Sequence, residues 1–244
     1  MDTFLWYYQL SRFLEAILPI AAIILSVIIL AKKDKKAKLL AVYCILISCS
    51  SLLSSFVDRM SRVSVQGYAA ASAVNSILGV LVSTTALIAI CVYAKNEYGS
   101  KVYVAVPSLY VGAQIIGRIA NAMAVTFAKG AGESEIIKKI CIAQAVSLVI
   151  NFIPSVILIR EFYINREKEL RFPMLWKLLG LVTVFAFLHN LFALLALFGQ
   201  SENGASETVI FLQDVSALTG VLCWFMIALY VLMRSKAGTD EATT

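Results

Sequence analysis

Charged residues are scarce in this 244-residue chain. Asp, Glu, Lys and Arg make up 15% of it, whereas hydrophobic residues make up 60%. A soluble domain cannot cover so much apolar surface with so little polar surface. The composition therefore excludes a water-soluble globular protein and indicates a protein of the lipid bilayer.

Histidine and the motifs of catalysis are almost absent. His189 is the only histidine, and the sequence contains no Cys-x-x-Cys, no His-Glu-x-x-His and no Gly-x-Ser-x-Gly. A chain without these groups lacks the usual means of binding a metal or of building a nucleophilic site. We therefore expect no enzyme activity, no metal and no cofactor. The five cysteines lie in apolar runs, so we expect them to be buried as small apolar side chains.

Long apolar runs are what the chain does contain. Seven of them occupy residues 13–31, 39–57, 72–94, 102–127, 136–159, 178–198 and 209–233. At a rise of about 1.5 Å per residue, a helix of some 20 residues crosses the roughly 30 Å hydrocarbon core of a membrane. A backbone in lipid must satisfy its own amide groups, which favours helices. The sequence predicts an all-α integral membrane protein with a single seven-helix transmembrane domain over residues 1–244.

Basic residues are distributed unevenly between the two predicted sides of the membrane. Fourteen Lys and Arg residues lie in the segments 32–38, 95–101, 160–177 and 234–236, and six, including Arg12, lie on the opposite side. Because basic loops stay in the cytoplasm, the N-terminus is predicted outside and the C-terminus inside. The basic loops are expected to attract anionic lipids. We expect a multi-pass protein of the plasma membrane that binds no nucleic acid.

The first three spans faintly resemble the last three. Three landmarks recur at separations of 135, 139 and 141 residues: Pro19 and Pro154, Lys38 and Lys177, and Gly79 and Gly220. Such separations predict two parallel three-helix repeats, 13–94 and 136–233, joined by a linker helix at 102–127, and chance similarity between apolar helices is the alternative. This arrangement resembles the layout of the SWEET sugar facilitators, although neither proline is followed by the Gln of the wider PQ-loop family. Parallel repeats of this kind hold a substrate between two halves.

Polar and charged side chains lie inside the predicted spans. A charge near the middle of a transmembrane helix costs about 2.5 to 3.5 kcal/mol, so it is expected to face protein or water. The candidate substrate-binding residues are Glu15, Gln114, Arg118, Asn121, Gln144, Asn151, His189, Asn190 and Asp214. Counting residues from the nearest basic loop predicts a polar track that descends from the outer surface to the middle of the membrane.

Arg118 and His189 are the most informative of these candidates. Arg118 offers a bidentate fork for an anionic group, and His189 is a residue type that changes charge near neutral pH. The residue count puts Glu15 at the level of Arg118, so the two are expected to meet, with Asp214 as a second candidate partner nearer the outer boundary. The alternatives are that the amides only bond between helices and that Arg118 extends to the outer headgroups.

These features favour a small-solute transporter that works by alternating access between two three-helix halves. The alternative is a ligand-sensing receptor, or an accessory subunit of a membrane complex, with no transport of its own. The expected partners are a small solute or ligand, the bilayer, and a second copy or another membrane subunit. Two other seven-helix classes are disfavoured, because residues 209–233 contain neither the lysine of a retinal protein nor the Asn-Pro-x-x-Tyr of a G-protein-coupled receptor.

Overall fold

The computed structural model describes residues 2–32, 34–61, 65–127, 133–200 and 207–240. These described residues form seven α-helices and no strand, which confirms the all-α prediction. The helices are α1 (Asp2–Leu30), α2 (Lys35–Ser61), α3 (Val65–Tyr98), α4 (Val102–Phe127), α5 (Glu133–Ile164), α6 (Leu175–Gln200) and α7 (Glu207–Asp240).

All seven helices are long and apolar enough to cross a membrane, as judged by length and composition. Helix α4 has the bounds that the sequence predicts, whereas the other six helices extend beyond the predicted apolar runs, α1 at its N-terminal end only. The difference arises because a helix continues until its backbone groups find other partners, and not until its apolar run stops. These helices suggest an integral multi-pass membrane protein.

Two connections show how the helices begin and end. Asp34 caps α2, because its Oδ1 accepts hydrogen bonds from the backbone N–H of Lys36 at 3.1 Å and of Ala37 at 3.3 Å. Gly99 follows α3 with a φ of 68°, and its N–H donates to the carbonyl of Lys95 across 2.9 Å. A left-handed residue at this position ends a helix and favours glycine.

The cap at Asp34 gives a first testable prediction. Replacing Asp34 by Ala removes the oxygen that accepts from the N–H groups of Lys36 and Ala37. It also removes the ion pair in which Arg171 Nη2 lies 2.5 Å from Asp34 Oδ2. Because losing a cap costs about 1 kcal/mol, the variant should unfold at a lower temperature in detergent. Asp34→Asn keeps a capping oxygen and should retain most of the stability. Equal melting of Asp34→Ala and the wild type would contradict the capping role.

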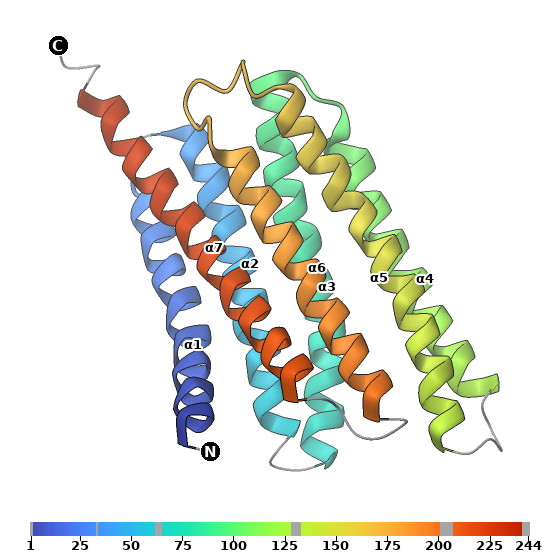
Figure 1. Ribbon diagram of the computed structural model, residues 1–244. Helices are drawn as coiled ribbons and strands as arrows, with labels where there is room; N and C mark the ends of the chain where they lie inside the picture. Colours follow the sequence, from blue (N-terminus) through green and yellow to red (C-terminus); the bar gives the residue numbers. More distant parts are fainter. Residues whose placement is uncertain (1, 33, 62–64, 128–132, 201–206, 241–244) are drawn as a thin grey trace.

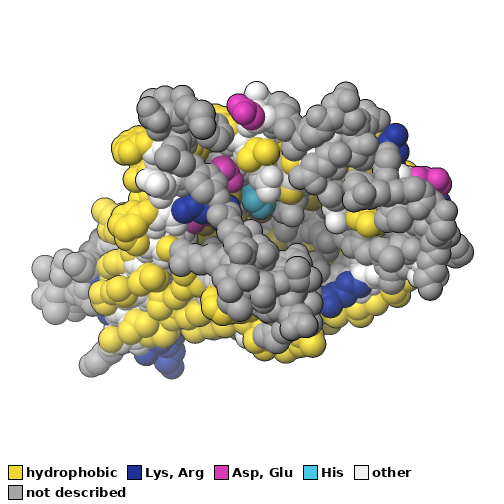
Figure 2. All heavy atoms as spheres, turned by 90° about the horizontal axis from the view of Figure 1, so that it is seen from below, with side chains coloured by type: hydrophobic (Ala, Val, Ile, Leu, Met, Phe, Trp, Pro, Cys, Tyr) yellow, Lys and Arg dark blue, Asp and Glu magenta, His cyan; other side chains and the backbone are white. Residues whose placement is uncertain are grey.

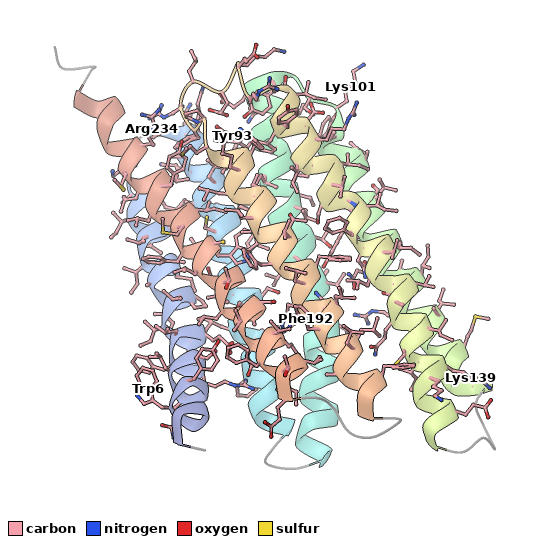
Figure 3. The ribbon with its side chains drawn as sticks, viewed as in Figure 1. Trp6, Tyr93, Lys101, Lys139, Phe192 and Arg234 are labelled. Carbon is pink, nitrogen blue, oxygen red and sulfur yellow. The ribbon has the colours of Figure 1, made fainter. Side chains whose placement is uncertain are left out.

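The helices form one bundle (Figure 1), and their contacts close it into a ring in chain order. Each helix packs against its neighbours in the chain, and α1 closes the ring against α7, while α2 also packs against α7. The two termini lie at opposite ends of the bundle. We call the end with the connections after α1, α3 and α5 the basic end, and the opposite end the N-terminal end. Figure 3 places Tyr93, Lys101 and Arg234 at the basic end and Trp6 and Lys139 at the N-terminal end.

The tightly packed core occupies the half of the bundle next to the basic end. Its largest fully buried side chains are Ile29, Leu40, Ile90, Tyr93, Val106, Phe162, Phe172, Leu175, Ile227 and Val231. They come from the C-terminal halves of the odd-numbered helices and from the first two turns of α2, α4 and α6, apart from Phe172, which precedes α6. Close packing therefore fills the half of the bundle next to the basic end.

Four of the five cysteines are buried and Cys49 is exposed, and all five are free thiols. The expectation of burial is therefore wrong for Cys49. An apolar run predicts that a helix is embedded, but it does not say which face of that helix meets the other helices. On α2, Cys49 follows the buried Ser48 and lies on the exposed face.

Candidate functional site

Three adjacent cavities lie inside the ring. The first has a volume of about 410 Å³ and is lined by α1, α2, α6 and α7. The second, of about 230 Å³, is lined by the six helices α2 to α7, and the third, of about 300 Å³, by α4, α5 and α6. Figure 2 looks onto the N-terminal end and shows acidic, basic and histidine side chains gathered beside a hollow in that face.

Charged side chains gather in the first cavity. Arg12 and Glu15 line it from α1, Asp214 from α7 and His189 from α6. A spacing of three residues places Arg12 and Glu15 on the same face of their helix. Burial, followed by the carboxylates of Asp214 and Glu15, raises the pKa of Tyr7 near the start of α1. Both acidic groups therefore lie close to the N-terminal end of α1.

His189 connects α6 to α7 by a defined hydrogen bond. Its Nδ1 lies 3.2 Å from the backbone carbonyl oxygen of Gln213. A carbonyl oxygen only accepts, so Nδ1 carries a proton in this hydrogen bond. The imidazole thus uses one nitrogen to hold the two helices together and offers the other to a group in the first cavity.

Aromatic side chains shape the second cavity. Its walls include Tyr43, Phe152, Phe187 and Trp224. The ring centroids of Phe152 and Phe187 are 4.8 Å apart, and those of Tyr43 and Trp224 are 5.3 Å apart in an edge-on arrangement. Ring pairs at these separations attract each other and hold their side chains in place. The second cavity therefore has a fixed and largely apolar shape.

Amide and hydroxyl groups line the third cavity. We call its polar residues the amide cluster, which consists of Gln114, Gln144, Ser147, Asn151 and Asn190. Gln114 Nε2 on α4 donates to Asn151 Oδ1 on α5 across 3.0 Å. Asn151 Nδ2 then donates to Ser147 Oγ across 3.1 Å. The cluster is therefore an ordered network centred on Asn151.

Shared residues join the three cavities. Ala186, Asn190 and Trp224 line both the first and the second cavity. Leu148, Asn151 and Asn190 line both the second and the third. Asn190 on α6 therefore borders all three, so that the cavities lie next to one another in a series from α1 to α4.

The third cavity depends on a close approach of α4 to α5. A Cβ added to Gly117 would lie 2.2 Å from Ser147 Oγ and 3.1 Å from Ser147 Cβ. Real atoms do not approach so closely, and Ser147 itself accepts the hydrogen bond from Asn151. Only glycine leaves room at residue 117 for the amide cluster in its present geometry.

This contact predicts that replacement by alanine costs much more stability at one glycine of α4 than at another. Gly117→Ala should destabilise the protein by about 1 to 3 kcal/mol, because Ser147 must move and the helices must separate. Gly112→Ala is the matched control, since a Cβ there meets nothing within 4 Å. Thermal unfolding in detergent measures both. Equal losses would contradict the close approach, and Gly117→Ala combined with Ser147→Ala should recover part of the stability.

The structure brings seven of the nine predicted site residues to the cavity walls. Glu15, His189 and Asp214 line the first cavity, Gln114 and Gln144 the third, Asn151 the second and third, and Asn190 all three. Arg118 is exposed on α4 and lines none of the three cavities that the described residues form. The side chain of Asn121 lies outside the described residues.

The expected meeting of Glu15 with Arg118 does not occur. Helix α1 packs against α2 and α7, and α4 packs against α3 and α5, so the two helices share no contact among the described residues. They stand on opposite sides of the bundle in Figure 1. Counting residues gives the depth of a side chain, but depth alone does not say which helices are neighbours.

Sequence reasoning missed Arg12 and Trp224. Arg12 was assigned to the outer surface, yet α1 begins at Asp2 and carries it into the first cavity. The three-residue spacing from Glu15 was the available signal. Trp224 lies within an apolar run, and its sequence context does not distinguish a cavity wall from a core position.

Comparison of the sequence with models of protein families and with curated proteins finds no match, and comparison of the structure with solved structures finds none either.

Proposed function

We propose that the protein is a small-solute transporter of the plasma membrane that works by alternating access. The observation that carries this proposal is the series of three adjacent cavities inside a bundle of apolar helices. Polar groups in a membrane interior are costly unless they contact protein, water or a solute. Seven such residues converge on these cavities, which supports a binding function over scattered contacts between helices.

The unequal packing of the two ends supports the mechanism. The core fills the basic end, the first cavity lies toward the N-terminal end, and the second reaches down to the core residues Tyr43, Leu158 and Leu179, as expected of a transporter that is open on one side only. With basic loops in the cytoplasm, this conformation faces outward. Transport then requires the helices α1 to α3 and α5 to α7 to move against each other, with α4 between them, as two parallel repeats would.

Solute entry into vesicles tests this proposal. Purified protein in liposomes should let at least one solute of a panel of polyols, amides, choline and gluconate enter faster than protein-free liposomes do. Asn151→Leu should reduce that rate roughly tenfold, because it removes the centre of the amide cluster. Val149→Leu is the matched control, since Val149 is 61% exposed and lines none of the cavities formed by the described residues.

The outcome separates transport from ligand sensing. If a solute binds the folded protein but no solute enters, the chain is a receptor or an accessory subunit, which would use the same cavities without moving their contents. Entry that does not respond to Asn151→Leu would contradict the assignment of the site.

A further inference from the structure

The second and third cavities have no charged side chain among the described residues that line them. The polar residues of the third cavity are the amide cluster, and those of the second are hydroxyl and amide residues such as Ser83, Asn151 and Thr183. An ion bound among these residues would exchange much of its water for neutral groups. The charge of Arg118 on α4 reaches Tyr110 in the wall of the second cavity, but Arg118 lines neither cavity. The walls themselves therefore favour an uncharged solute over an ionised one.

The charges of the first cavity do not remove this barrier. Arg12, Glu15 and Asp214 each already interact with other groups of the protein. They also line only the first cavity, on the α1 and α7 side. A solute bound at the amide cluster is therefore outside the cavity that these three charged residues line.

Amides suit a different kind of solute. Each side-chain amide has an oxygen that accepts and an NH₂ group that donates, so a cluster of them matches hydroxyl and amide groups, which also do both. Within the cluster, Gln114 Nε2 and Asn151 Nδ2 already donate to protein oxygens, and Asn190 Nδ2 donates to the carbonyl of Ala186 across 2.7 Å. These bonds fix the orientation of the three amides, so that their remaining groups are held in place for a solute.

We infer that the third cavity binds an uncharged solute that carries hydroxyl or amide groups. This inference rests on the proposed function and names the solute class of that site. The volume of about 300 Å³ is roughly ten times the share of one liquid water molecule, which sets the size to that of a small polyol or amide. The aromatic walls of the second cavity contact the carbon skeleton of the same solute.

Protection of an introduced thiol tests the inference without requiring transport. Ala193→Cys, in a variant whose five native cysteines are replaced, puts a thiol in the wall of the third cavity. Xylitol and acetamide are the uncharged probes, and choline and gluconate are the ionic ones. An uncharged probe should slow the reaction of the thiol with a polar alkylating reagent roughly tenfold at saturation. Lys101→Cys, at an exposed position of the basic end, should react equally fast with every probe.

Two further variants make the result specific. Asn151→Leu should abolish the protection, because it removes the central hydrogen-bonding residue of the amide cluster. Asn151→Asp adds a carboxylate to the neutral cavity and should make choline protective. The inference is overturned if choline or gluconate protects the thiol when Asn151 is unchanged. It is also overturned if neither xylitol nor acetamide protects it. Protection by xylitol or acetamide without entry into liposomes retains the inference and overturns the transport function.

Discussion

Replacing Glu169 by Ala should lower the melting temperature of the purified protein by roughly 6 to 12 °C. Glu169 lies between α5 and α6 and is only 5% exposed. Its Oε2 accepts hydrogen bonds from the Tyr93 hydroxyl at 2.7 Å and from the Tyr98 hydroxyl, and its Oε1 accepts one from the backbone N–H of Phe172 at 3.0 Å. Removing the carboxylate leaves three buried donors without this acceptor, at a cost of about 1 kcal/mol or more each.

The effect should be large because Glu169 lies inside the aromatic core of the basic end. The ring of Tyr93 stacks on that of Phe162 with centroids 6.1 Å apart, and Tyr98 meets Phe162 edge-on at 5.7 Å. A cavity left by Glu169 would open in this packed region and would admit no side chain without rearrangement. The loop after α5 would then lose its attachment to α3.

Glu167 provides the matched control two residues away. Its side chain is 85% exposed, and its ion pair with Arg166 spans 3.4 Å at the surface. Such exposed pairs contribute between zero and about 1 kcal/mol, so Glu167→Ala should melt close to the wild type. If both alanine variants melted alike, the buried network would not stabilise the basic end. In the Glu169→Ala protein, Tyr93→Phe should cost little, because it removes a hydroxyl that has already lost its acceptor.

The helices could be predicted from the sequence because membrane crossing sets their length and composition. The run 102–127 coincides with α4, five other runs lie within longer helices, and the run 13–31 overlaps α1 except for its last residue. Closure of the ring between α1 and α7 could not be predicted, because it depends on which helix faces pack together. Apolar residues facing lipid and apolar residues facing other helices look alike in the sequence. The predicted repeat of spans one to three in spans five to seven stays a prediction.

Within a single helix of the candidate site, the sequence likewise does not show which polar residues face the cavities. Gln114 and Arg118 were both predicted to line the site from α4. Gln114 bonds to Asn151, whereas Arg118 is exposed. Residues four apart lie one turn apart on the same side of a helix, so their spacing does not distinguish the two. Spacing thus predicted which helices carry polar groups, but only the packing shows which groups meet across helices.

The second large effect concerns access to the cavities from water. Ala186 on α6 lines the first and second cavities, and Val184, two residues away, is 49% exposed and lines none of the three. The two Cα atoms differ in depth by about 3 Å. In a bilayer, Val184 should face acyl chains and Ala186 the interior of the ring. A thiol reacts as its thiolate, which forms in water and not in hydrocarbon.

The decisive measurement compares Ala186→Cys with Val184→Cys in liposomes, in a variant whose native cysteines are replaced. The rate of modification by a charged, membrane-impermeant thiol reagent is measured from each side of the membrane. We predict that Ala186→Cys reacts at least roughly 100-fold faster than Val184→Cys, equivalent to about 2.7 kcal/mol, and from the N-terminal side. Equally slow reaction of the two thiols, or reaction of Ala186→Cys only from the basic side, would contradict a water-filled cavity that opens at the N-terminal end.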